Sequence, residues 1–371
     1  MQRREYQQKA IAFLAKSKRG IVQAPAGAGK THIAASALAV CLYKRKGVAN
    51  VEIMVNTIEQ VDQMQLACDR FEIINKKANL QIYCLAGAPL GTYPDLLIVD
   101  ECHRAAAPTW AYKIRQCQSA IWGLSATPFS ADKERNAYVR QLFDDNVHVI
   151  NRDQLVNDGH LANAKVVWHN VTNNYVADAI NNYSKKLVKS RRKKMPWMFR
   201  TDESSQKQIN QCKWQAAQKL GIWENKNRDA CIASIAKQNI CENNHTIVLI
   251  GSIDHGKRLV NAIPESELIF SKMGAKKRKD AIARFRNGSL RCIIGTSAIE
   301  EGFDAPIANV IIMAGCGRSE RKAIQSTGRI LRPHNGKLCG IIHDFHDECH
   351  PMLKRQSYSR LGIYKQLNYL Q

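Results

Sequence analysis

The stretch APAGAGKT at residues 24–31 has the residue types of a phosphate-binding loop. Gly27 and Gly29 let consecutive backbone N–H groups curl around an anion at the start of a helix, whose N-terminus favours negative charge. Lys30 would reach the β- and γ-phosphates of a nucleotide, and the Thr31 hydroxyl would bind Mg²⁺. A plain small-residue turn before a helix is the alternative. The other candidate nucleotide-binding positions of the loop are Pro25, Ala26 and Ala28.

A pair of carboxylates, Asp100 and Glu101, follows the apolar run Leu96–Val99. Such a run predicts a parallel strand that is covered on both faces, and ligands bind at the carboxyl ends of these strands. Asp100 would hold Mg²⁺ through its water shell, while Glu101 would orient and deprotonate an attacking water. Because the pair comes 70 residues after Lys30, the two stretches together predict hydrolysis of a nucleoside triphosphate.

A third group of reactive side chains lies in the sequence QSTGRILR at 325–332. Gln325, Arg329 and Arg332 recur at spacings of four and three, which places them on one helix face. Phosphoryl transfer needs cations that offset charge on the transferring group, so the two arginines are candidates for contacting a γ-phosphate. A solvated basic helix face is the alternative. Two further candidates for the nucleotide site lie just upstream, Gly302 and Asp304.

Two α/β lobes are expected to position these groups. Residues 1–150 alternate apolar strand runs with helical stretches, which is typical of a doubly wound parallel sheet. A second lobe of this kind is expected over 228–371, and the length of 371 residues suits two domains with an elaboration. Between the lobes we expect a crossing segment over 151–170 and a basic insertion or helical bridge over 171–227.

Six motifs in one fixed order resemble those of the superfamily 2 helicases. They are APAGAGKT at 24–31, VNT at 55–57, DECH at 100–103, SATP at 125–128, GTSAIEEGFD at 295–304 and QSTGRILR at 325–332. The resemblance implies two tandem RecA-like lobes that use ATP and Mg²⁺ while they bind nucleic acid. It also implies that Arg329 and Arg332 act on ATP across the cleft between the lobes. Residues that couple hydrolysis to lobe movement in the family match His103, Ser125 and Thr127.

The resemblance also implies contacts with adenine and with nucleic acid. The sequence Arg4–Gln7 resembles the element that reads adenine, with Gln7 as the contact. Backbone contacts with nucleic acid are implied for residues of both lobes. These are Thr57 and Gln63 in the first lobe and Ser252, Thr296 and Ser297 in the second.

Within superfamily 2, the chain is most similar to the group that contains UvsW, RadD and the XPB motors. The similarity rests on the DECH box, on Phe129 after SATP, and on the segments Asp158–Leu161 and Arg360–Tyr364. It implies an ATP-dependent DNA helicase or translocase that remodels or unwinds branched or forked DNA in replication, recombination or repair. Three alternatives remain: an RNA helicase, a translocase that moves on duplex without opening it, and an ATP-gated nucleic-acid clamp.

The charge of the chain agrees with a polyanionic partner. The formal net charge is +23, from 55 Lys and Arg against 32 Asp and Glu. Seven basic residues and no acidic residue lie in Lys185–Lys194, beside two aromatic residues that could stack on bases. A solvated loop whose aromatic residues pack against a lobe is the alternative. The candidate contacts in this segment are Arg191, Arg192, Lys193, Lys194, Trp197 and Phe199.

The twelve cysteines include no C-x-x-C pair, which favours reduced thiols and a cytoplasmic location. We expect neither membrane insertion nor secretion, because we find no apolar run near 20 residues and no N-terminal signal pattern. One cluster has side-chain types that suit zinc, although alternating apolar residues favour a strand and its exit loop. It consists of Cys339, His343, His346, Cys349 and His350.

Overall fold

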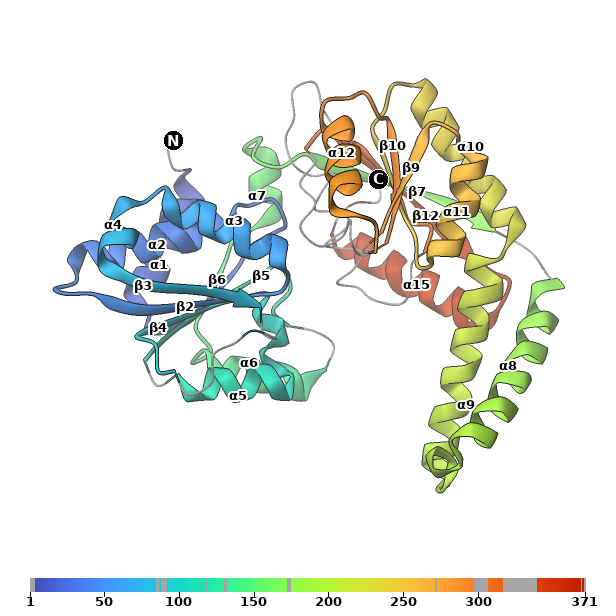
Figure 1. Cartoon of the computed structure of the whole chain (residues 1–371), viewed down its shortest axis with the longest axis horizontal. Coiled ribbons are helices and arrows are strands. Elements are labelled where there is room, and N and C mark those ends of the chain that lie inside the picture. The colour runs from blue at the N-terminus through green and yellow to red at the C-terminus, as the bar shows by residue number, and fades with distance from the viewer. Residues whose placement is uncertain are drawn as a thin grey trace. The chain divides into compact units, whose positions relative to one another are not determined.

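Two six-stranded parallel sheets organise the chain, one in each of two units, Met1–Leu161 and Ala162–Gln371 (Figure 1). The computed structural model describes residues 4–84, 87, 92–117, 119–129, 132–171, 175–270, 272–296, 306–315, 339–367 and 369. Each unit is an α/β lobe, as the alternation of strand and helix patterns predicted. Within the described residues, no helix is both long enough and apolar enough to span a membrane.

The sheet of the first unit has the strand order β3-β2-β4-β5-β1-β6, and neighbouring strands pair in parallel. This order places β4, β5 and β1 side by side, so their carboxyl ends meet at one edge. All five residues of β4 are buried, because helices cover both faces of the sheet. The strands are β1 Arg19–Gln23, β2 Ala49–Val55, β3 Ala78–Cys84, β4 Leu96–Asp100, β5 Ala120–Ser125 and β6 Val147–Val149.

Helices lie on both faces of this sheet. Figure 1 shows α1 to α4 on one face and α5 and α6 on the other. Helix α2 is buried along most of its length, since its alanines let the helix approach the sheet closely. The helices are α1 Glu5–Lys16, α2 Lys30–Lys44, α3 Ile58–Asp69, α4 Glu72–Lys77, α5 Pro108–Gln116, α6 Lys133–Leu142 and α7 Arg152–Asn157, with a 3₁₀ helix η2 at Cys102–Ala106.

The sheet of the second unit has the order β7-β12-β11-β8-β10-β9 and is also parallel. Strand β7 begins in the segment 151–170 that the sequence suggested as a crossing connection and ends at Val171, yet it pairs with β12 over nine residues and extends this sheet. The predicted crossing segment is therefore divided between α7 of the first unit and β7 of the second. The strands are β7 Asn163–Val171, β8 Thr246–Leu249, β9 Ser266–Ile269, β10 Cys292–Gly295, β11 Val310–Ile312 and β12 Cys339–Asp347.

One face of the second sheet packs against α10 and α11, through Ile232, Ala236 and Leu259 among others. The helices of this unit are α8 Tyr175–Lys194, α9 Asp202–Ala216, α10 Lys226–Cys241, α11 Ile253–Ala262, α12 Ala275–Arg286 and α15 Pro351–Gln366. The described residues of this unit also form a 3₁₀ helix η3 at Pro196–Phe199 and a π-helical turn η4 at Ala217–Trp223.

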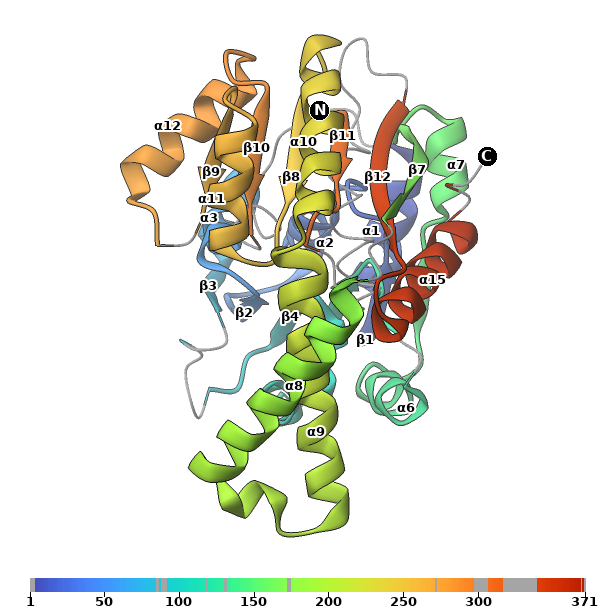
Figure 2. The ribbon, with the colours of Figure 1, turned by 90° about the vertical axis from the view of Figure 1, so that its right-hand side faces the viewer.

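The basic insertion forms a helical hairpin of α8 and α9, which Figure 2 shows side by side and extending away from the sheet. A small apolar cluster anchors its base, and Ile180 of α8, Ala216 of α9 and Leu353 of α15 belong to it. Gly221 allows this packing, because a Cβ there would lie 2.4 Å from Leu353 Cδ1. The hairpin is thus fixed to the second unit at one end and carries its exposed basic residues beyond that anchor.

Candidate nucleotide site and nucleic-acid contacts

The predicted phosphate loop joins the end of β1 to the start of α2. Gly27 and Gly29 have φ values of 89° and 82°, a region that favours glycine. Gly29 is the residue before the first turn of α2, and Lys30 begins that helix. Lys30 Nζ donates to the Ala24 carbonyl at 3.3 Å, so the ammonium group lies over the loop. The strand, loop and helix expected around the loop are therefore present, with Thr31 in the first turn of α2.

A segment from the N-terminal region closes against this loop. Tyr6 is buried, and its hydroxyl donates to the Ala28 carbonyl at 3.1 Å. Gln7 also lies beside the loop, since its Nε2 is 3.1 Å from the position that a Cβ on Gly29 would take. The structure thus brings Gln7 to the phosphate loop. Sequence reasoning missed the contact of Tyr6, although Tyr6 belongs to the same four-residue element.

The predicted acidic pair lies at the end of β4, and Glu101 forms a hydrogen-bonded cluster with the end of β5. Ser125 Oγ donates to Glu101 Oε2 at 3.2 Å, and His103 Nδ1 lies 3.1 Å from the same oxygen. The backbone N–H of Thr127 donates to Ser125 Oγ at 3.2 Å. Glu101 has a φ of 52°, a left-handed backbone conformation that residues other than glycine rarely adopt. The three residues predicted to couple hydrolysis to movement therefore meet at the proposed base.

The two carboxylates of the acidic pair have opposite pKa shifts. Burial, and then the negative charge of Glu101, raises the pKa of Asp100 to about 7, against the attraction of Lys30. Burial also acts to raise the pKa of Glu101, but the hydrogen bond from His103 and the charge of Lys30 outweigh it. The net pKa of Glu101 lies below its ordinary value, so its carboxylate is ionised near neutral pH and can accept a proton.

Thr31 and Asp100 fit a magnesium ion by chemistry and by environment. A hydroxyl and a carboxylate supply the oxygen ligands that Mg²⁺ prefers. Asp100 is only 8% exposed, and its burial disfavours the charged carboxylate. A bound cation would offset this penalty and return Asp100 to its ionised form.

The residues predicted to contact nucleic acid follow parallel strands. In the first unit, Thr57 comes after β2 and caps the N-terminus of α3, where its Oγ1 accepts from the Gln60 N–H at 3.3 Å. Gln63 is exposed on the same helix. In the second unit, Ser252 precedes α11 without capping it through its side chain, and Thr296 follows β10. Each set lies at the carboxyl edge of its own sheet, where helix N-termini favour phosphate.

Six predicted residues lie outside the described residues. They are Ser297, Gly302, Asp304, Gln325, Arg329 and Arg332. Their assignments rest on the sequence motifs.

The structure separates the candidate contacts of the basic insertion. The Arg191 guanidinium donates to the side-chain carbonyls of Gln208, Gln211 and Gln215 on α9, at 3.0, 2.9 and 3.0 Å. The Arg192 guanidinium lies 5.1 Å from the centre of the Phe199 ring. Trp197 is 56% exposed, and Lys193 and Lys194 are also exposed. Arg191 therefore joins the two helices, whereas its neighbours remain accessible.

Two buried arginine–aspartate pairs in the second unit were not predicted. Arg228 Nε donates to Asp347 at 2.8 Å. The Arg360 guanidinium binds both oxygens of Asp344, at 2.8 and 3.0 Å, and Tyr364 donates to the same carboxylate at 3.1 Å. These pairs attach α10 and α15 to β12. The segment Arg360–Tyr364, which sequence reasoning used only for its family resemblance, therefore has a structural role.

The cluster of cysteine and histidine residues forms a strand and its exit, as the apolar alternation favoured. His343 Nδ1 lies 2.9 Å from His169 Nε2, and the His350 side chain accepts from the Met352 N–H at the start of α15. Among the described residues, no group of three or more His, Cys, Asp or Glu side chains is arranged to hold a metal ion. The eleven cysteines that lie within the described residues are free thiols.

Two family descriptions match separate parts of the chain. Residues 1–88, which contain the phosphate loop, match the res subunit of type III restriction enzymes. Residues 212–334 match the helicase conserved C-terminal domain. The two matches fall on the first and second units, respectively.

Two relatives cover most of the chain. A protein named as helicase 22 of Sulfolobus islandicus filamentous virus is 23% identical over 93% of this chain and 63% of its own length. The DNA 3'-5' translocase XPB2 of Sulfurisphaera tokodaii is 26% identical over 89% of this chain and 78% of its own length. The chain thus spans less than two thirds of the viral relative.

Two solved structures share the fold. The helicase domain of Hef from Pyrococcus furiosus superposes with a TM-score of 0.55 at 16% identity, over 93% of this chain and 96% of that one. The type ISP restriction-modification enzyme LlaBIII, bound to DNA, gives a TM-score of 0.66 at 14% identity, over 98% of this chain and 30% of that one. The predicted fold of two RecA-like lobes is confirmed by these likenesses. The domain match in the second unit and the two relatives show that this chain is similar to helicases and DNA translocases.

Proposed function

We propose that this chain is an ATP-dependent DNA helicase or translocase that remodels or unwinds branched DNA in replication, recombination or repair. The hydrolytic part rests on one observation: Glu101 is hydrogen-bonded to Ser125 and lies against His103, at the sheet edge where the phosphate loop begins. A carboxylate held in this way can activate a water beside a bound nucleotide.

ATP hydrolysis would divide its tasks among the residues of this edge. Lys30 binds the β- and γ-phosphates at the N-terminus of α2, where backbone N–H groups add positive potential. When bound by Thr31 and Asp100, Mg²⁺ supplies charge that offsets the phosphate oxygens. Glu101 orients the attacking water and accepts its proton. Ser125 and His103 hold the Glu101 carboxylate in place for that transfer.

The same cluster offers a route from hydrolysis to movement. Ser125 Oγ bonds both to Glu101 and to the backbone of Thr127, in the segment that follows β5. A displacement of that segment would therefore change the orientation of the Glu101 carboxylate. This link supports the coupling roles of His103, Ser125 and Thr127.

DNA is the proposed partner because of charge and similarity. The net charge of +23 favours a polyanion, and a relative that covers 89% of this chain is named as a DNA translocase. The preference for branched DNA rests on the resemblance of the sequence motifs to the group with UvsW, RadD and XPB.

The test compares ATP hydrolysis by the whole chain with four nucleic acids: linear duplex, single-stranded DNA, RNA and a four-way junction. We expect the junction to stimulate turnover most, and the Glu101→Gln variant to show little turnover with any of them. Greater stimulation by RNA would support an RNA helicase instead. Turnover on duplex without strand separation would support a translocase, and DNA binding without turnover would support a clamp.

A further inference from the structure

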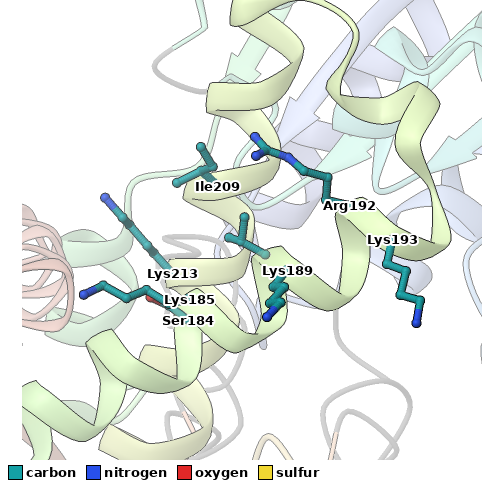
Figure 3. A pocket seen from close by; sticks show the side chains of 8 residues that line it. Ser184, Lys185, Lys189, Arg192, Lys193, Ile209 and Lys213 are labelled. Carbon is teal, nitrogen blue, oxygen red and sulfur yellow. The ribbon is translucent and has the colours of Figure 1, made fainter.

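A groove on the α8–α9 hairpin is lined by basic side chains from both helices. Its volume is about 540 Å³. Ser184, Val188 and Ile209 also line it, and Figure 3 shows Lys185 of α8 and Lys213 of α9 both extending to the left of the view. The basic residues of the groove are Lys185, Lys189, Arg192, Lys193 and Lys213.

Among the described residues, the positive charge of this groove has no acidic partner. No acidic residue is among its lining side chains, and within the part of the chain that the structure describes none of the five cations forms an ion pair. Basic residues elsewhere in the second unit differ, since Arg284 pairs with Glu267 and Asp280. Five cations around one groove repel each other, and an anionic ligand would relieve that repulsion.

The hairpin uses its basic residues in two ways. Arg191 turns toward α9 and binds three glutamine side chains, which joins the helices. Lys185, Lys189 and Lys193 recur every four residues, so they form a row along the groove side of α8. The positions of these three lysines are therefore held by a helix pair that Arg191 braces.

The length of this row matches several phosphates. Eight residues of helix between Lys185 and Lys193 span about 12 Å at 1.5 Å per residue. One strand of B-DNA presents a phosphate about every 3.4 Å along its axis, so the row faces roughly three to four phosphates. Val188 and Ile209 supply apolar surface along which lysine stems can lie while their ammonium groups stay in water.

We propose that this groove binds the phosphodiester backbone of duplex DNA, with Lys185, Lys189, Lys193 and Lys213 as phosphate contacts and Arg191 as the brace that positions α8. The inference rests on the proposed function, because it deepens the proposed DNA partner to a defined surface. No residue of the ATP-binding motifs lines the groove, so the groove contributes to DNA affinity and not to ATP hydrolysis itself.

The experiment measures duplex affinity over a series of salt concentrations. The groove variant carries Lys185→Gln, Lys189→Gln and Lys193→Gln, which keep good helix formers on α8. Its matched control carries Lys186→Gln, Arg200→Gln and Lys207→Gln, three exposed basic residues of the same hairpin that do not line the groove. Both variants lose three positive charges. Circular dichroism and thermal unfolding establish that both remain folded.

The groove variant should lower the magnitude of the salt slope by about 2 to 3, because each phosphate that is no longer neutralised by a lysine lowers it by about 0.9. The control should lower the magnitude of the salt slope by less than about 0.9, the value for a single phosphate. ATP hydrolysis without DNA should be unchanged in both variants. A wild-type chain that hydrolyses no ATP would contradict the proposed function, whereas the groove is tested by the salt slopes alone.

Two results would overturn the proposal. One is an equal change of slope in the groove variant and its control, which would show a diffuse effect of net charge. The other is a groove variant that keeps duplex binding and loses binding to vesicles containing phosphatidylserine, which would assign the groove to lipid headgroups.

Discussion

Ser125 Oγ donates a hydrogen bond to Glu101 Oε2 at 3.2 Å, although 24 residues of sequence separate the two. The contact forms because β4 and β5 are parallel neighbours, so Ser125 at the end of β5 and Glu101 just after β4 lie at the same edge of the sheet. It connects the proposed base with the segment after β5. The position of the base therefore depends on the backbone of a different motif.

Lys30→Ala and Glu101→Gln should both abolish most ATP turnover, through different steps. Lys30→Ala removes the phosphate contact, so nucleotide affinity should fall. Glu101→Gln keeps the shape of the side chain but removes the group that accepts the proton, which should lower turnover by about 10²- to 10⁴-fold with affinity retained. Nucleotide binding and steady-state hydrolysis, measured side by side, separate the two effects. Near-normal hydrolysis by Glu101→Gln would rule out its role as base.

Arg329→Ala should lower hydrolysis by roughly a thousandfold, as expected when an arginine that stabilises the transferring phosphoryl group is removed. This prediction rests on the sequence motif, because Arg329 lies outside the described residues. Nucleotide binding should change little, since Lys30 and the phosphate loop are intact. DNA-stimulated turnover at the wild-type rate would show that Arg329 has no part in catalysis.

Tyr6→Phe should weaken ATP binding about fivefold, because it removes the hydrogen bond to the Ala28 carbonyl, worth about 1 kcal/mol. The effect should appear in nucleotide affinity, measured by calorimetry. Tyr43→Phe on α2 is the matched control, since Tyr43 is 79% exposed and lies at the other end of that helix. Equal affinities in the two variants would show that the Tyr6 hydroxyl does not position the loop.

The stability of the protein should decrease between pH 6.5 and pH 4 because of His343. Burial, and then the nearby His169, lowers the pKa of His343 to about 4 in the folded chain, from 6.5 in the unfolded chain. As the pH falls through this window, the unfolded state binds a proton that the folded state does not. The free energy of unfolding should drop by about 2 kcal/mol at pH 5 relative to pH 7 from this residue alone.

His343→Gln removes this titration, so its free energy of unfolding should change less between pH 7 and pH 5 than that of the wild-type chain. Urea denaturation at the two pH values measures the difference. Identical pH dependence in both proteins would contradict the assignment. Other buried histidines with lowered pKa, including His255 and His350, should keep part of the dependence in the variant.

Arg191→Ala should loosen the hairpin, because the side-chain carbonyls of Gln208, Gln211 and Gln215 lose their donor. We expect α9 to lose about 1 kcal/mol of local stability, less than for buried charged hydrogen bonds because water reaches the site. Hydrogen exchange of the α9 amides reports the change. Arg200→Ala, at an exposed position near the tip, should leave exchange unaltered. Equal protection in the two variants would remove Arg191 as the brace.

The sequence by itself determined the elements whose signals are local. An apolar run predicted β4, the glycines and Lys30 predicted the phosphate loop, and the acidic pair was placed correctly at a strand end. These features depend on residues within about ten positions of each other, where hydrophobic periodicity and backbone preferences act directly. The order of the motifs then indicated two lobes, and the structure has two.

Only the tertiary structure decided which distant residues meet. The contact of Tyr6 with Ala28, the addition of β7 to the second sheet, and the separation of Arg191 from the groove lysines all join segments that have no shared local pattern. A basic run looks the same in sequence whether its residues face a neighbouring helix or a groove. Packing between helices and strands decides that difference, because it sets which side of each element is buried and which side remains open to a ligand.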